Sequence, residues 1–215
     1  MNKEKLRQLV ESASSLALEL VLAQKPGIKP SSKINYEDLH ALVHSPPKEM
    51  YPQCYTLFSF REPQIHDLLW GLKFRNDPSV ATLFAPHLAE AIEHLAKPEP
   101  IDRLIPLPLS DTRRKERGYN QSELLALAVQ TRLPLLGIDT TLLARRHTKP
   151  QTNLNRQARL QNVTGAYSIQ PDATVPHQHL LLIDDVITTG ASLNEAKRVL
   201  QEAGARRVTC LAIAG

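Results

Sequence analysis

The sequence predicts an α/β fold, with a mostly parallel sheet and helices on both of its faces. From residue 101 onward, segments of strand character alternate with segments of helical periodicity, which is the order of βαβ units. Residues 180–183 form an unbroken apolar run, as expected for a strand buried on both faces of a parallel sheet. The composition agrees, because 42% hydrophobic and 22% charged residues suit a globular domain.

The N-terminal part is predicted to lie outside this domain. Apolar residues recur at helical spacing over about residues 3–24, which predicts an amphipathic helix. Residues 25–50 are richer in Pro, Ser and Lys, as in a linker. We therefore expect an N-terminal helix and linker over residues 1–50 and the α/β domain over residues 51–215.

Local signals place the elements of the α/β domain. Asp77 before Pro78 predicts a helix start, Asn120 with Glu123 resembles a capping box, and Gly204 predicts a helix end. Strands are expected at about 55–60, 101–108, 136–144, 164–169, 179–184 and 207–214, and helices at about 65–72, 77–95, 120–133 and 191–203.

Composition also narrows the compartment and the class of site. Cys54 and Cys210 are the only cysteines and lack CxxC spacing, so we expect neither a disulfide framework nor zinc, and a reduced cytoplasmic compartment fits best. The histidines show no metal-ligand spacing beyond His177 and His179. No signal-peptide pattern and no apolar stretch of membrane-helix length is present, so no membrane partner is expected.

Two adjacent carboxylates, Asp184 and Asp185, end the apolar strand. Two like charges side by side are costly unless a cation or a hydroxyl-rich ligand compensates them. Thr188, Thr189 and Ser192 add hydroxyl groups where a helix begins, and helix N-termini bind anions. A structural turn would explain one Asp and one Thr, but not the whole string. The segment predicts a diol or metal site beside a phosphate site, and P-loop and dinucleotide fingerprints are absent.

This string resembles the phosphoribosyl pyrophosphate (PRPP) motif of the type I phosphoribosyltransferases. The resemblance implies that fold, and it implies that Asp184 and Asp185 are catalytic and hold the ribose hydroxyls, with Asp185 as the candidate general base. We expect that changing both to Asn would only relieve repulsion and leave the fold intact. The implied phosphoribosyl-binding residues are Asp184, Asp185, Val186, Ile187, Thr188, Thr189, Gly190, Ala191 and Ser192.

A basic segment follows the strand that ends in prolines, with four cations at residues 113–117. Such a cluster suits a polyanion such as pyrophosphate, although a solvated basic loop is the simpler interpretation. Arg-Gly-Tyr-Asn-Gln at residues 117–121 resembles a signature of the ComF-like family (competence protein F and GntX-like proteins), whose members carry a phosphoribosyltransferase domain. The implied pyrophosphate-binding residues are Leu107, Pro108, Arg114 and Arg117.

Residues 140–171 contain no Asp or Glu and several basic residues, which is typical of a disordered basic loop or a nucleic-acid patch. The ComF-like resemblance implies instead a flexible hood over the site at about residues 144–169. The hood residues that it implies are Arg146, Thr148, Gln151, Arg159 and Asn162.

The resemblance to ComF-like proteins extends to Lys73 but not to the N-terminal cysteines. Lys73 lies where ComF-like chains often have a lysine, so it either approaches the phosphates or is a solvated helix end. ComF-like proteins usually begin with a four-cysteine zinc ribbon, whereas only Cys54 stands in that region of this sequence.

The resemblance implies a phosphoribosyltransferase that binds PRPP with Mg²⁺, the ion being held through PRPP without direct protein ligands. It would transfer the phosphoribosyl group to an unidentified nitrogen acceptor and release pyrophosphate. The alternative is a non-catalytic PRPP sensor or DNA-uptake accessory that binds single-stranded nucleic acid through its basic loops. Single-strand platforms need stacking rings, and the basic loops hold only Tyr119 and Tyr167, which favours the small molecule. The sequence leaves open whether the chain forms a homodimer.

Overall fold

The computed structural model describes residues 34, 36–75, 77–146, 164–171, 173 and 175–215. The predicted helix over residues 3–24 and most of the predicted hood lie outside the described residues.

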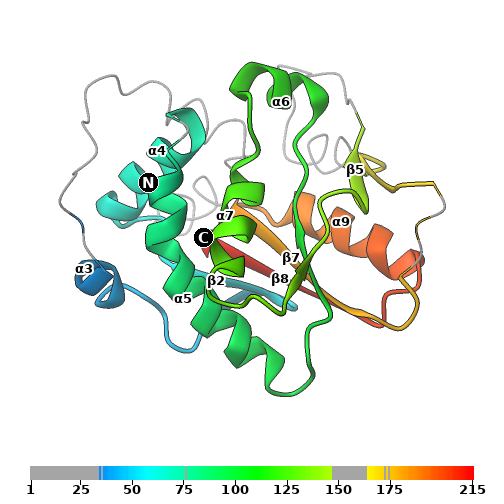
Figure 1. Cartoon of the computed structure of the whole chain (residues 1–215), viewed down its shortest axis with the longest axis horizontal. Helices are drawn as coiled ribbons and strands as arrows, with labels where there is room; N and C mark the ends of the chain where they lie inside the picture. Colours follow the sequence, from blue (N-terminus) through cyan, green and yellow to red (C-terminus); the bar gives the residue numbers. More distant parts are fainter. Residues whose placement is uncertain (1–33, 35, 76, 147–163, 172, 174) are drawn as a thin grey trace, which may run out of the picture.

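A six-stranded sheet forms the centre of the molecule (Figure 1). Its strands are β1 Lys48–Tyr51, β2 Cys54–Phe58, β3 Arg103–Pro106, β4 Gly137–Ile138, β7 His179–Val186 and β8 Arg207–Ala214. The strand order is β1-β2-β8-β7-β3-β4, and only the edge pair β1–β2 is antiparallel. The predicted α/β class with a mostly parallel sheet is therefore confirmed.

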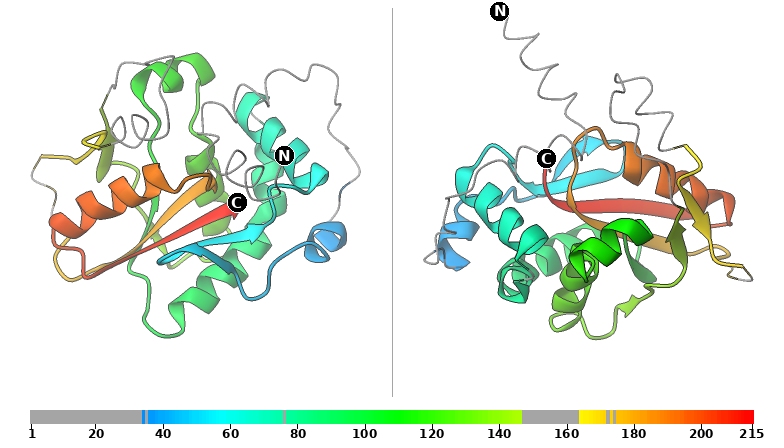
Figure 2. Two further views of the ribbon diagram at one scale, coloured as in Figure 1. Left: turned by 180° about the vertical axis from the view of Figure 1, so that it is seen from behind. Right: turned by 90° about the horizontal axis from the view of Figure 1, so that it is seen from above.

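Helices cover both faces of this sheet (Figure 2). They are α3 Tyr36–His40, α4 Pro63–Phe74, α5 Pro78–Ala96, α6 Asp111–Arg117, α7 Gln121–Gln130 and α9 Ala191–Glu202. Helices α4, α5 and α7 pack on one face, and α9 packs on the other beside an antiparallel ribbon of β5 (Leu143–Arg145) and β6 (Tyr167–Ile169).

Strand β7 contributes to the core on both faces, as its apolar run predicts. Leu181 and Ile183 pack with α4, α5 and α7, whereas Leu180 and Leu182 pack with α9. All four side chains are fully buried. The carboxyl end of β7 is thereby held between two rigid layers.

The predicted helix boundaries have the expected physical cause. The side chain of Asp77 accepts a hydrogen bond from the backbone N–H of Ser79, and Pro78 is the first residue of α5. Asn120 caps α7 in the same way by accepting from the N–H of Ser122. Gly204, with φ of +99°, follows the end of α9.

Two predictions of local structure are wrong. The strand expected over 136–144 is divided between β4 and β5, which belong to different sheets, because Asp139 accepts hydrogen bonds from the N–H groups of Thr141 and Leu142 and turns the chain. The cations expected in a loop lie in α6, which Ser110 caps and which ends at Gly118 with φ of +77°.

The described part of the predicted N-terminal segment contacts the α/β domain. Strand β1 pairs with β2 across the predicted boundary at residue 50, and Leu39 of α3 is fully buried in the core shared with α5. None of the described helices is long and apolar enough to cross a membrane.

Candidate functional site

The candidate site lies at the carboxyl end of β7, which runs between β8 and β3. Ligands of open parallel sheets bind at this edge. Asp184 and Asp185 lie near the end of β7, and two side chains from other elements reach them: Lys73 from the last turn of α4 and Ser122 from the first turn of α7.

Lys73 is the cation that compensates the acidic pair. Its Nζ lies 2.9 Å from Oδ2 of Asp185, and the two side chains are only 2% and 4% exposed. The interpretation of Lys73 as a solvated helix end is therefore wrong. A buried ion pair of this kind depends on both partners, because removing one leaves an unpaired charge in the interior. The same ion pair gives a physical reason to expect that Asp184→Asn with Asp185→Asn would destabilise the fold, since it leaves Lys73 buried without a charged partner.

The two carboxyl groups are electrostatically unequal. Burial, followed by repulsion from Asp185, raises the pKa of Asp184 to about 7. Asp184 also accepts hydrogen bonds at Oδ1 from Oγ of Ser122 at 3.0 Å and from the N–H of Asp185 at 2.9 Å. Burial acts to raise the pKa of Asp185 as well, but the charge and hydrogen bond of Lys73 bring that pKa below its ordinary value. Asp184 is therefore the member that titrates near neutral pH, while Asp185 stays ionised.

This inequality predicts how Asp184→Asn changes stability with pH. The native pKa is raised, so the native state binds more protons than the unfolded chain, and stability is lost as the pH rises from about 4 to about 7. Asn cannot ionise and still accepts from Ser122, so the variant should escape this loss. We expect its free energy of unfolding at pH 8 to exceed that of the wild type by about 1–3 kcal/mol, discounted for the partial exposure of Asp184. Urea unfolding at pH 4.5 and pH 8 measures the effect, and a variant less stable at pH 8 would contradict it.

The turn after β7 has the geometry of an anion site. Ile187 anchors its start by donating its N–H to the carbonyl of Ala214, and the hydroxyl of Tyr51 donates to the carbonyl of Thr188 at 3.0 Å. Gly190 precedes α9 with φ of +69°, without a side-chain cap. Within the described part of the chain, no hydrogen bond uses the backbone N–H of Thr188, Thr189 or Gly190. These donors at a helix N-terminus are available to an anion.

The predicted pyrophosphate loop lies beside the acidic pair. The N–H of Leu107 donates to the carbonyl of Ile183 in β7, and the carbonyl of Leu107 accepts from the side chain of Asn120. Leu107 is buried and Pro108 is half-buried. The backbone after β3 is thus fixed to both β7 and the start of α7.

The two predicted arginines have different surroundings. Arg114 forms a two-pronged ion pair with Glu123, at 2.7 and 3.1 Å, so a ligand would have to compete for it. Arg117 lies with its guanidinium 5.4 Å from the ring centre of Phe74. After burial and Lys73, the charge of Arg117 also contributes to the lowered pKa of Asp185, which places it near the acidic pair.

Most of the predicted hood is outside the described residues. Thr148, Gln151, Arg159 and Asn162 lie there, so their roles stay predictions. Arg146 is described and exposed, and its N–H donates to the carbonyl of Ala166 beside the β5–β6 ribbon.

Three residues beside the acidic pair, Ser122, Tyr51 and Tyr167, and the pairing of Lys73 with Asp185 were not predicted as parts of the site. Tyr167 is 3% exposed, and burial, with a contribution from Asp184, raises its pKa. Only Ser122 had a local signal, since it directly follows the predicted start of the helix after the proline loop. The others come from segments distant in sequence, which no local pattern links to the pair.

The chain was compared with known proteins, and its relatives include competence proteins and DNA utilization proteins. No family model matches the chain. Competence protein F of Haemophilus influenzae is 33% identical over 148 residues, which is 66% of this chain and 63% of that protein. The chain is ComF-like. It is also 31% identical to competence protein ComFC of Streptococcus pneumoniae, over 71% of this chain and 64% of that protein, and 28% identical to the DNA utilization protein YhgH of Escherichia coli K12, over 68% and 65%. The ComF-like chain thus spans just under two thirds of the length of each of these relatives.

Solved structures with a similar arrangement include adenine phosphoribosyltransferases. The enzyme from Leishmania tarentolae aligns with a TM-score of 0.44 and 15% identity, over 77% of this chain and 79% of that one. The Saccharomyces cerevisiae enzyme aligns with a TM-score of 0.41 and 15% identity, over 84% and 88%. A likeness of this degree does not bear on ligand or activity.

Proposed function

We propose that the ComF-like chain binds PRPP with Mg²⁺ and transfers the phosphoribosyl group to a nitrogen acceptor, releasing pyrophosphate. The observation that carries the proposal is the unequal acidic pair beside a turn with available N–H groups. Lys73 neutralises Asp185, which leaves Asp184 to receive hydroxyl groups of a ribose. The turn before α9 then receives the 5′-phosphate.

The donor set also fits the magnesium that PRPP carries. Mg²⁺ prefers oxygen ligands, keeps several waters and is bound through few protein carboxylates together with substrate phosphates. A partly exposed Asp184 with neighbouring threonine hydroxyls can accept hydrogen bonds from the waters of such an ion, so the ion can be held through PRPP without direct protein ligands. The ion would neutralise the charge of the departing pyrophosphate.

The pKa values bear on the choice of general base. A catalytic base works best when its pKa lies near the operating pH. The pKa of Asp184 is about 7, whereas that of Asp185 is lowered by Lys73. Asp184 is therefore the better candidate to accept a proton from the attacking nitrogen, in place of Asp185.

A second candidate function is binding of single-stranded nucleic acid, because the relatives include competence and DNA utilization proteins. The exposure of each aromatic ring in the structure decides whether it could stack on a nucleic-acid base. Tyr167 is buried, and Tyr119 is half-buried with its hydroxyl bonded to the carbonyl of Leu72, so neither offers an open stacking face. Phe74, in contrast, is 40% exposed and lies against Arg117. One such ring could stack on a base of a nucleic acid or on an aromatic acceptor, but not on PRPP itself.

Calorimetry with PRPP and Mg²⁺ tests the first function. The full chain should bind PRPP at one site, and Asp184→Asn should weaken binding by tenfold or more, because a carboxylate acceptor of ribose hydroxyls is lost. Glu93→Gln removes the same charge from an exposed position of α5 and is the matched control. Absence of PRPP binding, or unchanged affinity in Asp184→Asn, would refute the proposal. Release of pyrophosphate with a panel of bases and amines then identifies the acceptor.

Arg117 separates the two functions. If it binds pyrophosphate, Arg117→Ala should cost about 1.5–3 kcal/mol of PRPP binding, and Arg117→Lys should not fully restore it, because the planar fork is lost. If it neutralises a nucleic-acid backbone, the Arg117→Lys variant should bind oligonucleotides nearly as well as the wild type. The Arg117→Ala variant should then show a slope of log affinity against log salt concentration that is smaller by about one unit. We expect the first pattern.

A further inference from the structure

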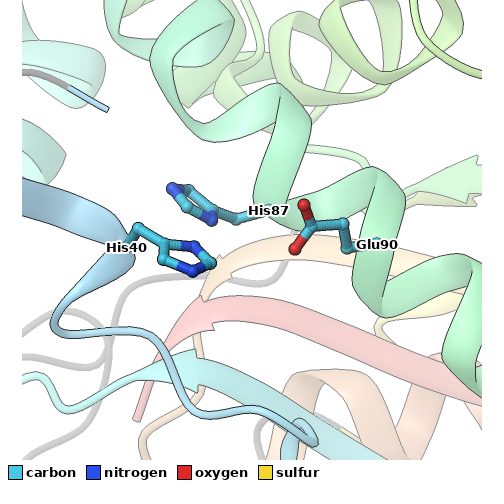
Figure 3. A group of neighbouring side chains, drawn as sticks. All are labelled: His40, His87 and Glu90. Atoms are coloured by element: carbon cyan, nitrogen blue, oxygen red, sulfur yellow. The ribbon is translucent and has the colours of Figure 1, made fainter. Parts of the chain in front are cut away.

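A cluster of metal-ligating side chains joins α3 to α5. His87 and Glu90 project from α5 toward His40 of α3 (Figure 3). One potential ligand atom from each of the three residues lies within 4.8 Å of the other two. Neither helix contributes a contact to the acidic pair, so the cluster is separate from the site already described.

His87 is the unusual member of the cluster. It is 1% exposed, and within the described residues neither of its ring nitrogens has a hydrogen-bond partner. Buried polar groups are nearly always paired, because an unpaired one loses its hydration without compensation. The ring is held in place by Tyr36, which stacks on it with centroids 4.7 Å apart and planes 2° apart. The buried nitrogens therefore need a partner that no described protein group supplies.

We propose that His40, His87 and Glu90 bind one divalent transition-metal ion of the zinc class, with water in the fourth position. Two imidazoles and one carboxylate form a donor set that suits Zn²⁺ and disfavours Mg²⁺. His87 and Glu90 are three residues apart on one helix and so lie on one face of α5. This inference does not depend on the proposed function.

The required adjustment is small. Bonds of about 2.0–2.1 Å in a tetrahedral site place ligand atoms roughly 3.4 Å apart, so donors that lie up to 4.8 Å apart must approach by at most roughly 1.4 Å. His40 and Glu90 are exposed, and rotation of their side chains can supply this movement. His87 stays fixed by its packing.

The surroundings of the cluster also fit an ion. The hydroxyl of Tyr36 donates to Oε1 of Glu90 at 3.4 Å, and such outer contacts orient ligating groups. An open pocket of about 590 Å³, which Tyr36, Glu90 and Arg132 help to line, lies on the Glu90 side of the cluster.

The consequence of binding would be a link between α3 and α5. The ion would pin α3 to the α/β domain beside Leu39, which already packs in the core. Cysteine content and local histidine spacing do not reveal this cluster, because two of its ligands share α5 while the third comes from α3.

Zinc titration of the tag-free, full-length chain after chelator treatment tests the proposal. Calorimetry should show one equivalent of Zn²⁺ bound, with a zinc-dependent rise in Tm, since a ligand of the native state stabilises it. His40 and Glu90 are exposed, so the His40→Ala and Glu90→Gln variants should fold. Each should weaken zinc affinity on the order of 100-fold, given that losing only an outer contact costs 10–100-fold. Co²⁺ should give the absorption spectrum of a tetrahedral site, which a packing role would not produce.

Three control variants locate any binding. His177→Asn changes an exposed histidine in the loop before β7 and should leave affinity unchanged. Asp184→Asn and Cys54→Ser test the acidic pair and the buried cysteines as competing zinc ligands. No saturable binding at one equivalent, or binding that survives His40→Ala with Glu90→Gln, would overturn the proposal, as would a loss confined to the Asp184 or Cys54 variant.

Discussion

Lys73→Ala should destabilise the ComF-like chain by about 3–5 kcal/mol, because it leaves Asp185 buried and charged without a partner. Asp185 has a lowered native pKa, so the stability that the pair contributes is present at neutral pH and is lost as the pH falls through that pKa. Urea unfolding at pH 7 should therefore show the largest difference from the wild type. Lys97→Ala, which removes an exposed lysine after α5, is the matched control and should change stability by less than about 0.5 kcal/mol.

The double variant Lys73→Met with Asp185→Asn distinguishes charge from packing. It removes both charges and keeps a side chain of similar length, so it should recover much of the stability lost in Lys73→Ala. If Lys73→Ala unfolds like the Lys97→Ala control, the ion pair does not stabilise the fold. If the double variant is as unstable as Lys73→Ala, lost packing rather than an uncompensated charge is the cause.

Gly190→Ala should damage both stability and PRPP binding. With φ of +69°, a residue that carries Cβ is strained at this position by about 1–2 kcal/mol. The new Cβ would also lie 3.0 Å from Cδ2 of Tyr51, a rigid ring whose hydroxyl holds the carbonyl of Thr188. Displacing Tyr51 would reshape the turn that presents the N–H groups, so we expect PRPP affinity to fall by tenfold or more. Thermal unfolding and calorimetry measure the two effects.

Gly137→Ala is the control for this substitution, since its Cβ would meet nothing within 4 Å and its φ is not in the left-handed region. The Gly137→Ala variant should have a thermal stability and a PRPP affinity near those of the wild type. Wild-type PRPP affinity in Gly190→Ala would show that the turn does not hold the phosphate.

The class of the fold and the position of the acidic pair along the chain could be predicted from local sequence patterns. Both depend on short-range patterns: the apolar run of β7, the alternation of strands and helices, and the caps at Asp77 and Asn120. An apolar run buried on both faces predicts a central parallel strand, and the end of such a strand is where ligands bind. These signals lie within a few residues of one another, so they can be read without tertiary contacts.

The groups that complete the site could be identified only from the folded chain. The partner of Asp185 is Lys73 from α4, the donor to Asp184 is Ser122 from α7, and the ring that supports the turn is Tyr51 from β1. The sequence showed that two adjacent carboxylates need compensation, but burial and distance set which of them keeps its charge. The pKa of a carboxyl group depends on solvation and on charges a few ångströms away. Those charges are brought together by chain folding between elements that are far apart in the sequence.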